Sequence, residues 1–85
     1  MNFELSQHAR DELARRGIPA SVVDSVLAGP EQKVPEHGSV TCYPSRVTIN
    51  DKPYLLRVMV DDTRQPAVVV TVYRTSKISK YWSQP

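Results

Sequence analysis

The chain has 85 residues and a formal net charge of +2, with 40% hydrophobic and 24% charged residues. A chain this short forms one modest core, so we predict a single domain over residues 1–85 and exclude a cleft between domains. The composition excludes a disordered tail, and no apolar run is long enough to cross a bilayer. A lone cysteine, Cys42, excludes an internal disulfide and fits a reducing compartment, so we expect a cytoplasmic protein.

The N-terminal third predicts two helices. Ser6 is a suitable N-cap for a first helix over residues 6–16, and Gly17 provides the left-handed residue that ends it. His8 falls in the first turn of this helix. A second helix is expected from Pro19, in its first turn, to the stop at residues 28–30, with an apolar stripe at residues 22, 23, 26 and 27.

The rest of the chain changes to a period of two. After a polar loop at residues 31–38, we predict strands over residues 40–49, 54–60 and 67–74, the last as the central strand. Pro44 restricts its part of the first of these strands to a sheet edge or a bulge. Short connections favour antiparallel pairing, which gives an α+β fold with two N-terminal helices on a three- to four-stranded antiparallel sheet. Residues 78–82 form a short C-terminal tail of about one helical turn, with Tyr81 and Trp82 folding back on the sheet.

Basic residues gather late in the sequence. The last acidic residue is Asp62, whereas the segment that follows carries only cations: Arg64, Arg74, Lys77 and Lys80. We therefore predict that the C-terminal quarter faces anions.

Several motifs in this order resemble those of a known family: His8-Ala9, then Leu13, then residues 16–18 (Arg-Gly-Ile), and a late strand that reads Val-Val-Val-Thr-Val-Tyr-Arg-Thr-Ser. With them the chain resembles, over nearly its whole length, a bacterial domain of unknown function grouped with the RelE/ParE and BrnT-like toxins. The resemblance implies a RelE-like fold and endoribonuclease activity. The family commonly has Arg four residues after the motif His, where this chain has Glu12.

RelE-like nucleases work without a metal, so the site must supply proton transfer and positive charge. We predict His8, Arg57, Arg74 and Lys77 as catalytic residues, with Arg16, Tyr73 and Lys80 binding RNA or phosphate. Arg57 and Arg74 lie on adjacent predicted strands and are expected to converge on one phosphate. The positive end of the helix dipole favours neutral imidazole at His8, and a bound phosphate favours imidazolium.

Structural roles remain open for the same residues. His8 can shield the helix flank or bond Glu12, and Arg57 can pair with Glu12 or Asp11. Arg74 and Lys77 can solvate a strand end, and Arg16 suits a helix C-terminus.

Metal chemistry has little support in the sequence. His8, His37 and Cys42 are the only soft ligands and lack zinc-site spacing, so we expect no metal and no cofactor. We expect His37 to be solvated and Cys42 to be a half-buried strand residue without a catalytic role.

The leading hypothesis is a metal-independent endoribonuclease of the toxin–antitoxin type that cleaves RNA by attack of the 2′-OH. Its expected partners are RNA and an antitoxin protein. The alternative is a non-catalytic interaction module of the same fold that binds a protein or nucleic acid. A third reading is a ParE-like inhibitor of a protein target.

Overall fold

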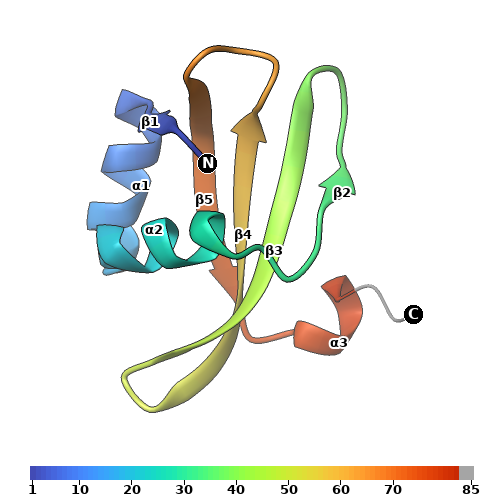
Figure 1. The fold of residues 1–85 in the computed structure, drawn as a ribbon. Helices are drawn as coiled ribbons and strands as arrows, with labels where there is room; N and C mark the ends of the chain where they lie inside the picture. The colour runs from blue at the N-terminus through green and yellow to red at the C-terminus, as the bar shows by residue number, and fades with distance from the viewer. Residues whose placement is uncertain (83–85) are drawn as a thin grey trace.

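The computed structural model describes residues 1–82 and has an α+β fold (Figure 1). The elements in chain order are β1 (Phe3–Leu5), α1 (Gln7–Arg16), α2 (Ala20–Ala28), β2 (Val34–Pro35), β3 (Val40–Ile49), β4 (Lys52–Asp61), β5 (Ala67–Thr75) and α3 (Ile78–Tyr81). The strands form one sheet in the order β1-β5-β4-β3-β2. The α+β class and the two N-terminal helices are confirmed.

The expected sheet of three or four antiparallel strands is wrong in two respects. Residues 3–5, before α1, form a strand, β1, that pairs parallel with β5, and the polar loop at residues 31–38 contains the short strand β2. The sheet is therefore five-stranded and mixed. Short connections force antiparallel pairing only between consecutive strands, and the long chain segment between β1 and β5 imposes no such limit.

The strand at the centre of the sheet is β4, whereas β5 had been predicted there. β4 pairs along most of its length with β3 on one side and β5 on the other. Its side chains at Leu55, Leu56, Val58 and Val60 are fully buried. β4 lies between the two strands that precede and follow it in the chain, so it is central because consecutive strands pair with each other.

The ends of the helices follow from local chemistry. The Ser6 hydroxyl accepts a hydrogen bond from the Ala9 amide at 3.0 Å, and Gly17 adopts a left-handed φ of 65° after the last turn of α1. Pro19 is the N-cap of α2, one residue outside the helix in which it was predicted. Both helices cover one face of the sheet (Figure 1), and residues such as Leu13 and Val23 pack there against the β4 residues Leu56 and Val58.

Pro44 lies within β3, where the neighbouring strand β2 reaches only Thr41 and Cys42. The Arg46 amide donates to the Glu31 carboxylate at 2.9 Å, outside the sheet ladder. Because backbone direction alternates along a strand, the Pro44 nitrogen also points to this outer edge, so no ladder hydrogen bond is lost. The predicted edge position of Pro44 is therefore confirmed.

Arg57 and the polar residues around it lie on the second face of the sheet. Arg57 pairs with Tyr73, and Met59 pairs with Thr71 and Cys42, so these side chains share the face opposite α1 and α2. We call it the Arg57 face. The C-terminal tail folds back as predicted: the Arg57 guanidinium lies 5.4 Å from the Tyr81 ring centre, and that of Arg46 lies 4.7 Å from Trp82. Among residues 1–82 no helix has the length and apolar character needed to span a membrane.

Candidate functional site

Arg57 is the centre of the polar cluster on the Arg57 face. Its side chain is only 14% exposed and donates to the Tyr73 hydroxyl and, at 2.6 Å, to the Glu36 carboxylate. Glu36 comes from the segment between β2 and β3, so the ion pair joins this segment to the middle of the sheet. The predicted alternative partners were Glu12 and Asp11, and neither of them forms this pair.

The charge of Arg57 is secured by its neighbours. Burial acts against the charged form, but the hydrogen bond with Tyr73 and the negative charge of Glu36 outweigh it, so the pKa of Arg57 lies above its usual value. Its buried Nε–H group has no hydrogen-bond partner among the described residues. Arg57 is therefore a fixed cation held between the Tyr73 hydroxyl and the Glu36 carboxylate.

A pocket of about 380 Å³ lies beside this ion pair. It is lined by His8, Glu36, His37, Val40, Met59, Val70 and Thr71. Glu36 thus belongs both to the pocket wall and to the ion pair with Arg57. The pocket brings together two imidazoles from segments far apart in the sequence, over an apolar floor.

His8 reaches the pocket because α1 begins at the edge of β5. The Ser6 amide donates to the Val69 carbonyl at 3.0 Å, and the Ser6 hydroxyl donates to the Val70 carbonyl at 3.1 Å. The β4 and β5 registers shift between Met59 and Val60, which leaves Val70 as the extra residue of a β-bulge. The bulge frees the Val70 carbonyl from the ladder, and the bond to Ser6 then fixes the first turn of α1 beside the pocket.

His37 is held by a tight turn between β2 and β3. The Glu36 amide donates to the Val40 carbonyl and the Val40 amide donates to the His37 carbonyl, both at 3.1 Å. Gly38 completes the turn with a φ of 58°, a conformation that favours glycine. One short turn therefore carries both the partner of Arg57 and the second imidazole.

The two imidazoles suit proton transfer, and the nearby guanidinium suits stabilisation of a negatively charged group. Imidazoles are the side chains best able to accept and release protons near neutral pH, and a guanidinium binds phosphate through paired donors. Burial raises the pKa of the Cys42 thiol, so Cys42 is a protonated core residue. Cys42 was expected to be half-buried, and it is fully buried.

The structure separates several residues that were predicted to act together. Arg74 pairs with Leu56 and therefore lies on the helix-covered face, with its guanidinium 4.7 Å from the Tyr54 ring centre. Neighbouring residues of a strand point to opposite faces, so Tyr73 accompanies Arg57 and Arg74 does not. The predicted convergence of Arg57 and Arg74 on one phosphate is wrong.

The remaining predicted site residues do not line the histidine pocket. Arg16 bonds Glu12 at 2.8 Å, and hydrogen bonds from Arg15 and Arg16 hold the pKa of Glu12 at about 2. Lys77 precedes α3 with an exposed side chain, and the Lys80 ammonium lies 5.3 Å from the Tyr81 ring centre. Lys77 and Lys80 are thus near the tail, whereas Arg16 is engaged within α1.

Sequence reasoning missed Glu36 and His37. Both lie in a polar loop, where a solvated side chain is the usual outcome, and His37 is indeed exposed. The one local signal was His37 before Gly38, which is typical of a tight turn that projects a side chain. Among residues 1–82 no group of three or more His, Cys, Asp or Glu side chains is placed to hold a metal ion.

Fold and site together define a small α+β domain with a histidine-lined pocket on the sheet face that α1 and α2 leave uncovered. The chain belongs to the family described as Domain of unknown function (DUF4258), which it matches over residues 5–74. That span contains both histidines, Glu36, Arg57 and Tyr73, and it ends before α3. Neither the curated proteins nor the solved structures contain a match to this chain.

Proposed function

We propose that this protein is a metal-independent endoribonuclease of RelE-like type that acts on RNA as the toxin of a toxin–antitoxin pair. The observation that carries the proposal is the pocket in which His8 and His37 lie together beside the Glu36–Arg57 ion pair. Two proton-transfer groups next to a fixed cation are the parts that 2′-OH attack on a phosphodiester requires.

In the proposed reaction, one imidazole removes the proton of the ribose 2′-OH. The 2′-oxygen forms a bond to phosphorus, the bond from phosphorus to the 5′-oxygen breaks, and the other imidazole, as imidazolium, donates a proton to that leaving oxygen. The products are a 2′,3′-cyclic phosphate and a 5′-hydroxyl. Arg57 stabilises the charge on the phosphoryl oxygens, and Tyr73 positions its guanidinium through their hydrogen bond.

The other predicted residues have smaller roles in this proposal. Lys77 and Lys80 add positive charge along the RNA path near Tyr81, which is 38% exposed and offers a ring for base stacking. Arg74 and Arg16 are left out, because one lies on the opposite face and the other is bound to Glu12. Glu12 replaces the Arg common in the family, so anion binding depends on Arg57 in this chain.

RNA cleavage by the purified protein in EDTA tests the proposal. We expect His8→Ala and His37→Ala each to lower the cleavage rate by about 10² to 10⁴-fold, the usual contribution of a general acid or base. Arg74→Ala is the matched control on the opposite face and should cleave at the wild-type rate. RNA with a 2′-O-methyl group at the scissile position should stay intact.

Wild-type rates in both histidine variants would refute the site, and absence of cleavage of free and ribosome-bound RNA would refute the activity.

The Glu36–Arg57 pair also favours a second candidate function, because it already neutralises the central cation. In that case the protein is a non-catalytic module that binds a protein or nucleic acid. Expression in bacteria separates the readings: a ribonuclease toxin arrests growth and degrades RNA, a ParE-like inhibitor arrests growth with RNA intact, and a binding module does neither.

A further inference from the structure

The outer edge of β1 has unpaired backbone groups. The Ala67 amide donates to the Asn2 carbonyl at 3.2 Å, and the Ser6 amide donates to the Val69 carbonyl at 3.0 Å. In a parallel ladder only alternate residues bond the neighbouring strand, so Phe3 and Leu5 direct their amides and carbonyls away from β5. These four groups have no hydrogen-bond partner within residues 1–82.

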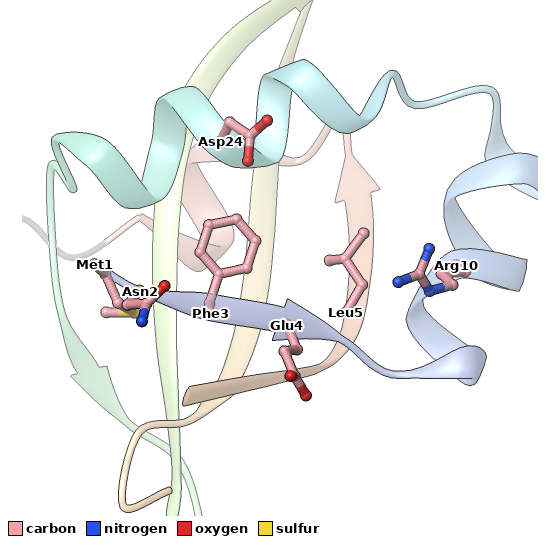
Figure 2. A pocket seen from close by; sticks show the side chains of 7 residues that line it. All are labelled: Met1, Asn2, Phe3, Glu4, Leu5, Arg10 and Asp24. Carbon is pink, nitrogen blue, oxygen red and sulfur yellow. The ribbon is translucent and has the colours of Figure 1, made fainter. Parts of the chain in front are cut away.

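A groove of about 610 Å³ runs along this edge. It is lined by residues 1–5 together with Arg10 of α1 and Asp24 of α2. Figure 2 shows Phe3 and Leu5 pointing toward α2, Glu4 pointing to the opposite side, and the Arg10 guanidinium near the Leu5 end of the strand. The groove therefore combines a row of free backbone donors and acceptors with apolar side chains beneath a helix.

The charges around the groove are unsatisfied. Across the described part of the chain, Glu4, Arg10 and Asp24 form no ion pair, although five arginines and one lysine elsewhere do. Asp24 lies over Phe3 and Arg10 lies beside Leu5, so the two charges mark the two ends of β1 (Figure 2). A ligand here has to match a backbone pattern and a charge pattern at once.

We propose that the β1 edge binds an extended segment of another protein, which adds to the sheet as a sixth strand and carries Lys or Arg opposite Glu4. Only a strand supplies alternating amides and carbonyls at the spacing of Phe3 and Leu5. The side chains of the bound segment that point toward α2 are small and apolar, because they pack beside Phe3 and Leu5. The segment also presents a basic group toward Asp24 and an acidic group toward Arg10.

A second copy of the chain fits this edge poorly. Antiparallel pairing of two β1 strands that uses all four free groups sets Phe3 against Leu5 and places Glu4 directly opposite Glu4 of the other copy. Like charges directly opposite each other destabilise a strand pair, and charged residues on short edge strands are a common protection against self-association. Glu4 thus favours a basic segment from a different protein.

The edge and the histidine-lined pocket share no lining residue. Occupation of one leaves the other open, so the partner can be bound whether or not the pocket cleaves RNA. Binding at the β1 edge is therefore independent of the proposed RNA cleavage.

The test uses two synthetic eight-residue peptides of alternating valine and threonine, one with a central lysine and one with a central glutamate. Binding to the full-length protein is followed by NMR shifts of the Phe3 and Leu5 amides. We expect the lysine peptide to bind and to shift these amides. The same peptide, N-methylated at the residues that face β1, should not bind, because it keeps the side chains and loses the backbone donors.

A charge reversal separates strand addition from loose electrostatic attraction. Glu4→Lys should weaken binding of the lysine peptide by roughly threefold to tenfold, since the cross-strand charge pair changes from attraction to repulsion. The same substitution should strengthen binding of the glutamate peptide. Asp11→Lys makes the same change of charge at an exposed α1 position outside the groove and should leave both affinities unchanged.

Three results would overturn the proposal. The first is that neither peptide binds at a concentration of about 2 mM. The second is that the N-methylated peptide binds as well as the unmodified one. The third is that the shifts at the β1 edge arise from self-association of the protein alone. The last result would assign the edge to a second copy.

Discussion

Glu36→Gln is the most informative single substitution, because Glu36 serves two roles at once. Its carboxylate forms the 2.6 Å ion pair that neutralises Arg57, and under the proposed function it competes with the RNA phosphate for that guanidinium. Removal of the charge should therefore change stability and anion binding in opposite directions. Glutamine keeps the shape and one acceptor oxygen, so the substitution tests the charge alone.

The cost in stability follows from burial. The side chains of Arg57 and Glu36 are 14% and 27% exposed, so the pair lies between a surface pair, worth about 0.2–1 kcal/mol, and a buried pair, whose disruption costs about 3–5 kcal/mol. Arg57 keeps its bond with Tyr73, so we expect a loss of about 1–2 kcal/mol. With a urea m-value near 1 kcal/mol per M, the unfolding midpoint falls by about 1–2 M.

The gain in anion binding is measured with a non-cleavable 2′-O-methyl oligonucleotide by fluorescence anisotropy at fixed salt. Loss of a competing carboxylate worth 1–2 kcal/mol should tighten binding by about 5- to 30-fold. Glu12→Gln, a carboxylate bonded to Arg15 and Arg16 away from the pocket, should leave binding unchanged. Weaker binding by Glu36→Gln would refute the reasoning, since Glu36 would then position Arg57 for the ligand instead of competing with it.

Two further predictions concern the frame of the site. Burial and the hydrogen bond to Asp62 raise the pKa of Tyr43 to about 12, so the folded state holds this proton more tightly than the unfolded chain. We therefore expect about 2–3 kcal/mol of the free energy of unfolding to be lost as the pH rises from 10 to 12. Urea unfolding across this range should show the loss, and a loss of equal size in Tyr43→Phe would contradict it. Ser6→Ala removes the α1 cap and the bond to Val70, so thermal unfolding should show a loss of about 1–2 kcal/mol; an unchanged midpoint would show that the bulge does not anchor α1.

Much of the fold could be predicted because its signals are local. Ser6 and Gly17 act through the hydrogen bonds and φ angles of their own neighbourhood, and the long apolar strands β3, β4 and β5 show their period of two directly. The short strands β1 and β2 were missed because three and two residues are too few to show a period. The pairing of β1 depends in addition on β5, near the other end of the chain.

The site could be predicted only in part. Arg57 was identified because a cation within an apolar strand needs a partner, and Tyr73 was identified as a neighbour of the basic segment. His37 and Glu36 were missed because a turn far from His8 in the sequence brings them to the pocket. Nothing in the local pattern of residues 31–38 shows that this turn folds over the sheet.

By itself, the sequence determined the two N-terminal helices and the three long strands, because their caps and periods are local, and it identified Arg57 as a cation that needs a partner. Only the tertiary structure decided which residues share its face. Side chains alternate across a sheet, so a register shift of one residue moves a side chain to the other side. The pairing of Arg57 with Tyr73 placed Arg74 on the opposite face, and the turn between β2 and β3 brought Glu36 to Arg57. Both placements arise from packing across the whole sheet.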